Sequence, residues 1–236
     1  MLLPELIGGD VGADVYQAEV QTLASDLGVW IVGGSHFCRD GEKLTNRGIV
    51  ADPHGSVVAS YGKLNPYGHE RARDVRSGSG PASFQIGDLS CLVMICADFW
   101  HAQAFEAAEP LPDLILAPAF SLSQRPDPSM ARARWRHAMI ARSYEFAAFV
   151  AVSDWAHPVR FGTGTSSGVA GFAHPNPRSP AELHRPLGRR RVAAFDLDMD
   201  AVRELSANRE GRGFDLTRHL RPDQREGFRP ITEIVE

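Results

Sequence analysis

Cysteine is scarce in this sequence: only Cys38, Cys91 and Cys96 occur in 236 residues, and none belongs to a Cys-x-x-Cys pair. An odd number of cysteines without that spacing argues against a disulfide framework and a structural zinc site, and fits a reducing compartment. The chain also lacks an apolar run of about 18 residues, and its start, MLLPELIGGD, lacks a signal-peptide pattern. We therefore expect a cytoplasmic protein with no membrane partner.

The sequence also has no strong excess of positive or negative side chains: its formal net charge is only −4. The sequence therefore offers no general attraction for nucleic acid. Neither GxGxxG nor GxxxxGK[ST] occurs, so a nucleotide-phosphate loop has no support. No linker or internal repeat divides the chain, and its 43% hydrophobic content fits an ordinary globular protein. We expect one domain over residues 1–236.

Apolar runs alternate with helical patterns along most of the chain. Short buried runs predict strands, and longer periodic segments predict helices, while the proline-rich segment 174–186 predicts a loop. The expected strands are 29–34, 46–51, 56–61, 91–96, 113–117, 149–153, 169–172 and 192–197, and the expected helices are 16–27, 98–109, 130–147 and 199–208. This alternation indicates an α/β fold with helix-covered sheets. The turn Asp52-Pro53-His54-Gly55 predicts a hairpin, so the sheet must be mixed.

One apolar run, 91–96, ends in a cysteine. Cys96 is either a small residue in the core, which is the commoner role of a free cysteine, or a nucleophile held where the strand ends. A helix start after the strand would supply N–H groups that favour a thiolate or an oxyanion. Cys91 lies in the middle of the run, and we expect it in the core.

Two charged residues also follow apolar runs. Lys63 comes directly after the run 56–61, and Glu5 follows the short run at the start of the chain. Each has a simple alternative explanation, as a solvated lysine at a hairpin exit and as a glutamate near a chain end. A thiol nucleophile needs a base, however, and none of the nine histidines has a recognisable cysteine-protease context.

The segments LLPEL, SYGKLNPYGHE and LVMICADFW together resemble the nitrilase, or carbon–nitrogen hydrolase, superfamily. Further segments, such as DLILAPAF and ARSYEFAAFVAVSDW, are similar to that family too. The resemblance implies a four-layer α-β-β-α sandwich of two mixed sheets. It also implies that Glu5 is the general base, Lys63 the oxyanion-stabilising cation, Cys96 the nucleophile and Glu70 a second, positioning glutamate.

The resemblance further implies hydrolysis of a small amide to ammonia and a carboxylic acid through a thioester, with no metal or organic cofactor. The N–H of Ala97 is the expected second oxyanion donor. Trp100, Phe120 and Trp155 are candidates to line the substrate pocket, although aromatic residues at such positions are more often plain core. The family commonly forms dimers, so we expect a homodimer or higher homo-oligomer.

The segments ICADFW and NPYGHE look most like the glutaminase domain of glutamine-dependent NAD synthetases. That branch usually has an acidic residue where this sequence has Ala97, and no synthetase domain is visible, so we expect no NAD synthesis by this chain alone. The patterns Cys-Trp-Glu of true nitrilases and Cys-Asn-Asp of carbamoyl-amino-acid hydrolases are also missing. The branch therefore stays open.

Family members carry a strand and a helix ahead of the base, whereas Glu5 is preceded here by four residues. Either the start is misassigned or the sandwich lacks its first strand and helix, which would leave Glu5 poorly held. Two other functions stay open, and only the first depends on how well Glu5 is held. One is a catalytically silent relative that binds a metabolite or partner, and the other is an acyl transferase that uses the same three residues.

Overall fold

The computed structural model of the protein describes residues 1–106, 108 and 110–214. The first sheet is built around the long strand β3 (Lys43–Ala51). One edge of β3 pairs antiparallel with β1 (Ile31–Val32) and β2 (His36–Asp40). Its other edge pairs antiparallel with β4 (Val57–Gly62) and parallel with β5 (Val75–Arg76). The predicted hairpin of β3 and β4 is thus confirmed.

The second sheet has six strands, in the order β14-β13-β10-β8-β7-β6. Its centre is parallel, with β7 (Leu89–Val93), β8 (Leu114–Pro118) and β10 (Phe149–Ser153) side by side. Antiparallel strands flank this centre. On one side β6 (Ala82–Ile86) pairs with β7, and on the other β13 (Gly171–Ala173) pairs with β10 and β14 (His184–Pro186) pairs with β13. A small third sheet joins β9 (Leu122–Ser123), β11 (Arg160–Phe161) and β12 (Gly164–Ser166).

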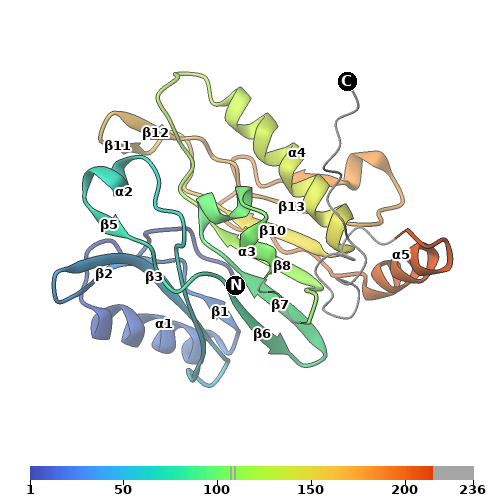
Figure 1. The fold of residues 1–236 in the computed structure, drawn as a ribbon, viewed down its shortest axis with the longest axis horizontal. Coiled ribbons are helices and arrows are strands. Elements are labelled where there is room, and N and C mark those ends of the chain that lie inside the picture. The colour runs from blue at the N-terminus through green and yellow to red at the C-terminus, as the bar shows by residue number, and fades with distance from the viewer. Residues whose placement is uncertain (107, 109, 215–236) are drawn as a thin grey trace, which may run out of the picture.

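The two main sheets form the inner layers of a four-layer sandwich, as expected. Helix α1 (Ala13–Leu27) packs outside the first sheet, and α4 (Ser129–Phe146) packs outside the second (Figure 1). Between the sheets, Val32, Val50 and Tyr61 of the first contact Val93 and Leu116 of the second. Cys91 belongs to this inter-sheet core, as predicted.

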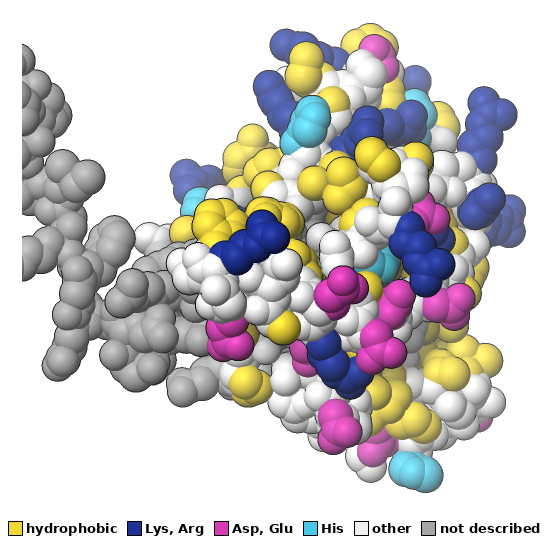
Figure 2. Space-filling view, turned by 90° about the vertical axis from the view of Figure 1, so that its right-hand side faces the viewer, with side chains coloured by type: hydrophobic (Ala, Val, Ile, Leu, Met, Phe, Trp, Pro, Cys, Tyr) yellow, Lys and Arg dark blue, Asp and Glu magenta, His cyan; other side chains and the backbone are white. Residues whose placement is uncertain are grey.

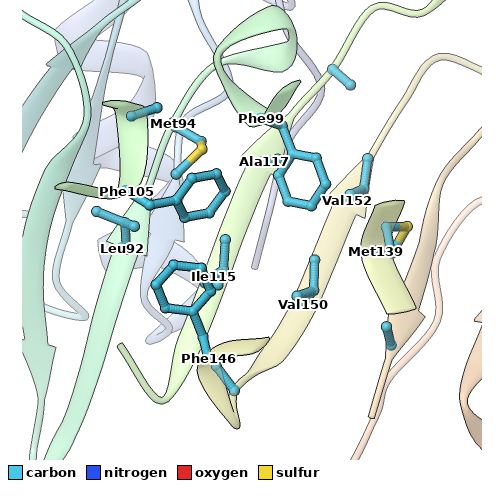
Figure 3. Close-up of a cluster of buried hydrophobic side chains, with 14 of the residues drawn as sticks. Leu92, Met94, Phe99, Phe105, Ile115, Ala117, Met139, Phe146, Val150 and Val152 are labelled. Atoms are coloured by element: carbon cyan, nitrogen blue, oxygen red, sulfur yellow. The ribbon is translucent and has the colours of Figure 1, made fainter. Parts of the chain in front are cut away.

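The largest apolar cluster fills the outer face of the second sheet. Leu92, Ile115 and Val150 come from its three parallel strands and face Met139 and Phe146 of α4 (Figure 3). Phe99 and Phe105 complete the cluster from the segment after β7. Burying several large apolar side chains, at about 1.5–3 kcal/mol each, fixes α4 and the strand ends on which the site is built.

Two predictions of secondary structure, a helix over residues 98–109 and a strand over residues 192–197, are wrong. Instead of a helix over 98–109, the chain forms a 3₁₀ helix, η1 (Cys96–Trp100), and one turn of helix, α3 (Gln103–Glu106). Residues 192–197 form no strand. Phe195 stacks on Phe172 of β13 instead, with ring centroids 4.6 Å apart. This segment therefore covers the sheet with side chains and does not extend it.

The remaining short elements are α2 (His69–Ala72), η2 (Pro180–Glu182) and α5 (Met199–Gly211). On the face of the molecule seen from the right of Figure 1, Lys and Arg side chains are most frequent in the upper part and Asp and Glu in the lower part (Figure 2). None of the helices that the structure describes has the length and hydropathy needed to cross a membrane.

Candidate active site

Glu5 lies where the chain leaves the gap between the two sheets. The N–H of Leu3 donates to Val32 O (3.0 Å) in the first sheet, and the N–H of Glu5 donates to Ala119 O (3.2 Å) after β8. Trp155 Nε1 donates to the Glu5 carbonyl (2.7 Å). Figure 1 places the N-terminus between the two sheets. The expectation that Glu5 would be poorly held is therefore wrong, because its backbone is fixed from several sides.

Gly34 makes room for this segment. It has a φ of +69°, and a Cβ atom there would stand 2.1 Å from the carbonyl oxygen of Pro4. Only glycine combines this left-handed backbone with so close an approach. The kink after β1 thus places the first sheet directly against the residue before Glu5.

The side chains of Glu5, Lys63 and Glu70 form one buried charged group. The Lys63 ammonium lies 2.7 Å from Glu5 Oε1 and 2.5 Å from Glu70 Oε2. Lys63, which directly follows β4, is 4% exposed, and Glu5 is 2% exposed. Glu5 and Lys63 are therefore not solvated surface residues, and one cation is shared by two carboxylates away from water.

Asn46, which the sequence did not single out, joins the two carboxylates. Its Nδ2 donates to Glu5 Oε1 and to Glu70 Oε1, at 2.8 Å each. Glu5 Oε2 accepts from the N–H of Phe120 (2.9 Å), and Glu70 Oε2 accepts from the N–H of Tyr67 (2.9 Å). Buried charges are tolerated only when paired and hydrogen-bonded in this way, and the geometry of the group is fixed as a result.

Cys96 stands at the turn that follows β7. Its φ is +43°, a left-handed conformation that side-chain-bearing residues rarely adopt. Such strain persists where the surrounding structure fixes it and is frequent at functional sites. Cys96 is partly exposed, whereas Cys38 and Cys91 are buried. The turn thus presents one thiol to the space in front of the charged group.

Burial and the nearby Glu5 carboxylate raise the pKa of the Cys96 thiol well above its ordinary value, while Lys63 and the N–H of Phe120 act in the opposite direction. Burial also raises the pKa of Glu5, with Lys63 opposing and Glu70 adding to it. Burial alone would lower the pKa of Lys63, but the charges of Glu5, Cys96 and Glu70 outweigh it and raise that pKa. Glu5 is therefore a stronger base than a free glutamate, beside a cation that stays charged.

Two further aspartates, neither predicted as site residues, tie the surrounding loops together: Asp98, which is buried, and Asp154, which is half-buried. Asp98 accepts from the N–H groups of Leu64 (2.9 Å) and Asn65 (2.8 Å), and so links the Cys96 turn to the residues after Lys63. Asp154 accepts from the N–H groups of Ser121 (3.1 Å), Trp155 (2.9 Å) and Val169 (2.8 Å). Burial raises its pKa to about 7.

Two cavities meet at Cys96. The larger, of about 760 Å³, is lined by Glu5, Lys63, Cys96 and Ala97 among others. The smaller, of about 410 Å³, shares Cys96, Ala97 and Phe120 with it and extends to Trp100 and Trp135. Trp155 is not among the described residues that line either cavity, and it lies behind Glu5, against Phe120.

The described part of the chain contains no group of three or more His, Cys, Asp or Glu side chains placed to hold a metal ion. The side chains gathered at this site supply a thiol, two carboxylates and an ammonium. A thiol that can give its proton to an adjacent carboxylate, beside a fixed positive charge, is suited to attack on a carbonyl carbon.

No protein-family model and no curated protein sequence matches this chain. Solved structures do match it. An amidase from Nesterenkonia sp. is 24% identical, with a TM-score of 0.61 over 74% of this chain and 68% of that one. A variant of the Nesterenkonia sp. AN1 amidase, with acrylamide added at its active-site cysteine, is 23% identical, with a TM-score of 0.64 over 90% and 85% of the two chains.

A further variant of the AN1 amidase, in complex with butyramide, is 23% identical, with a TM-score of 0.61 over 84% of this chain and 73% of that one. The AN1 amidase is described as a member of the nitrilase superfamily. At this level of identity the likeness concerns the fold, and it agrees with the sandwich described above. The chain has the fold of the nitrilase-superfamily amidases.

Proposed function

We propose that this protein is a carbon–nitrogen hydrolase of the nitrilase superfamily that releases ammonia from a small amide. The observation that carries the proposal is the buried group of Glu5, Lys63 and Glu70, which opens on the same cavity as the thiol of Cys96. These residues come from distant parts of the chain and meet at one place. The fold-level likeness to amidases supports the same function.

In the first half of the reaction, Glu5 takes the proton of the Cys96 thiol, and the sulfur adds to the carbonyl carbon of the amide. The negative charge that develops on the carbonyl oxygen is stabilised by the Lys63 ammonium and the N–H of Ala97. The proton held by Glu5 then passes to the nitrogen, the carbon–nitrogen bond breaks, and ammonia leaves a thioester on Cys96.

In the second half, Glu5 removes a proton from water, which adds to the thioester carbonyl. The same two groups stabilise the second oxyanion, and the carboxylic acid leaves as the sulfur regains a proton. Glu70 contacts no reacting atom in this scheme and acts as a positioning residue, because it holds Lys63 together with Asn46.

The placement of Glu5 counts against a catalytically silent protein. A poorly held base would favour that alternative. Instead, the Glu5 carboxylate accepts three hydrogen bonds, from Asn46, Lys63 and Phe120. The homodimer or higher homo-oligomer implied by the family resemblance stays a prediction, which light scattering of the purified protein would test.

Ammonia release from a series of small amides, from acetamide to butyramide, tests the proposed function. We expect wild-type protein to release ammonia and Cys96→Ala to lose the activity by about 10⁴-fold or more while its melting temperature is kept. Cys91→Ala is the matched control, because Cys91 is a buried core thiol. Equal ammonia release from wild-type protein and Cys96→Ala would contradict the proposal.

A further inference from the structure

Two guanidinium groups stand at the mouth of the larger cavity. Arg125 follows β9, Arg134 belongs to α4, and both line the cavity that contains Cys96. Both side chains are exposed. Within the described ranges, neither guanidinium takes part in an ion pair. These two positive charges are therefore available to a bound molecule.

Two acidic side chains, Glu5 and Asp127, line the same cavity, against the three basic side chains Lys63, Arg125 and Arg134. Glu5 lies at the bottom of the cavity, paired with Lys63. Asp127 lies at the mouth, but its carboxylate accepts from the N–H (2.9 Å) and the hydroxyl (2.7 Å) of Ser129. These hydrogen bonds lower the pKa of Asp127, so it keeps its negative charge, and they hold it at the start of α4. The basic side chains still outnumber the acidic ones in the lining.

The larger cavity also has uncharged polar side chains in its lining. Ser123 and Thr163 line the larger cavity together with the two arginines, whereas the smaller cavity extends to Trp100 and Trp135. Arg134 lines both cavities, and Arg125 lines only the larger one. Both arginines meet only in the lining of the larger cavity, so a negatively charged group is favoured there.

We propose that the substrate is an amide that carries a carboxylate at its far end, and this inference rests on the proposed function. The amide carbonyl lies against Cys96, while Arg125 and Arg134 bind the carboxylate in the larger cavity. Guanidinium groups suit this task because their N–H groups can pair with both carboxylate oxygens. Hydrolysis of such a substrate consumes one water and yields ammonia and a dicarboxylate.

The experiment compares two substrates of equal length: glutaramate, which has a free carboxylate, and its methyl ester, which has none. For wild-type protein we expect kcat/KM for glutaramate to be about tenfold higher or more. We expect Arg134→Gln and Arg125→Gln each to lower that value about tenfold and to lower kcat/KM for the methyl ester much less. Arg136→Gln is the matched control, because Arg136 is exposed on the same helix but outside both cavities.

Ionic strength adds a readout that a purely structural role would not change. We expect added salt to lower kcat/KM for glutaramate in wild-type protein more than in Arg134→Gln, and to have little effect on the methyl ester. Equal kcat/KM values for the two substrates, or variants that slow both substrates alike, would overturn the inference and leave the proposed function in place.

A binding measurement separates this inference from a failure of the proposed function. If no amide is hydrolysed, the proposed function fails, and calorimetric titration with glutarate still tests the arginines. Binding of glutarate that Arg134→Gln weakens about tenfold, and Arg136→Gln does not, would support a carboxylate site. No binding of glutarate to the wild-type protein at millimolar concentration would overturn it.

Discussion

The charged group of Glu5, Lys63 and Glu70 is as deeply buried as the apolar cluster on the outer face of the second sheet (Figure 3). The apolar cluster stabilises the fold through the area that it removes from water. The charged group has a desolvation cost that its ion pairs and hydrogen bonds must offset. One region is thus explained by stability alone, while the other needs a chemical reason to be present.

Replacement of Lys63 should have the largest effect, because it leaves two buried carboxylates without their shared cation. We expect Lys63→Met to lower the free energy of unfolding by about 3–5 kcal/mol near pH 7. Ammonia release per folded molecule should fall by about 10²–10³-fold, through loss of the oxyanion-stabilising charge. Urea unfolding at several pH values checks the cause, because the loss of stability should shrink as acid protonates the carboxylates.

Glu5→Gln should separate catalysis from stability. It removes the base, so we expect ammonia release to fall by about 10²–10⁴-fold. It leaves Lys63 paired with Glu70, so the free energy of unfolding should change less than in Lys63→Met. A larger loss of stability in Glu5→Gln than in Lys63→Met would contradict the account of one cation shared by two carboxylates.

A substitution in the apolar cluster should lower stability and leave the activity of the folded protein nearly unchanged, which is the opposite of the result expected for Glu5→Gln. Met139 is fully buried against the second sheet, and Met139→Ala should cost about 2–5 kcal/mol of unfolding free energy. We expect the activity of the folded fraction to stay near that of the wild-type protein. The measurements are urea unfolding and ammonia release at equal concentrations of folded protein.

Asp154 differs from both regions, because it is half-buried and holds loops together through its hydrogen bonds. Asp154→Asn removes one acceptor, because an amide nitrogen cannot accept the hydrogen bond from Val169 that Asp154 Oδ2 accepts. We expect a loss of about 1–3 kcal/mol at pH 5. The folded pKa of about 7 lies above the ordinary value of 3.8, so protonated Asp154 stabilises the fold at low pH.

That contribution is lost as pH rises toward 7, so the difference between Asp154→Asn and wild-type protein should shrink at pH 8. Thermal unfolding of the two proteins between pH 4 and pH 8 would measure this difference in stability, because that range covers both the ordinary pKa of 3.8 and the raised pKa of about 7. A difference that grows with pH would show that Asp154 does not titrate in this way.

The dependence of the activity on pH should be the smallest of these effects. Glu5 must be ionised to act as base, and its pKa is raised above the ordinary value of 4.5. Protonated Glu5 stabilises the fold below that value, and the contribution is lost as pH rises through the folded pKa. Activity should therefore rise with pH while this contribution to stability falls. A profile of kcat/KM with its acid midpoint at or below 4.5 would contradict the raised pKa.

The sequence indicated residues that lie close together in the candidate site, but it did not indicate the residue that joins them. Glu5, Lys63 and Cys96 were singled out because each follows an apolar run, and the structure places Glu5 and Lys63 together beside the cavity of Cys96. Asn46 was not singled out, because one polar residue in a strand has no motif. Its role depends on two carboxylates from distant segments that only the fold brings within reach.

Several fold elements were missed for similar reasons. The strands β5, β6 and β14 lie in polar or proline-rich segments whose composition indicates loops, and they form because neighbouring strands offer free edges. Residues 192–197 alternate as a strand would, but they pack their side chains on a sheet. The local sequence pattern correctly predicted that strands and helices alternate along the chain. Which segments pair as strands depended on partners that are distant in the sequence.

The reactivity of the three cysteines toward iodoacetamide tests the central claim most directly. In native protein, intact mass and peptide mapping should show a single adduct on Cys96, formed ahead of any on Cys38 and Cys91, with ammonia release lost in proportion. Full modification of Cys96 with unchanged ammonia release, or equal labelling of all three cysteines only after denaturation, would show that this thiol is not the nucleophile.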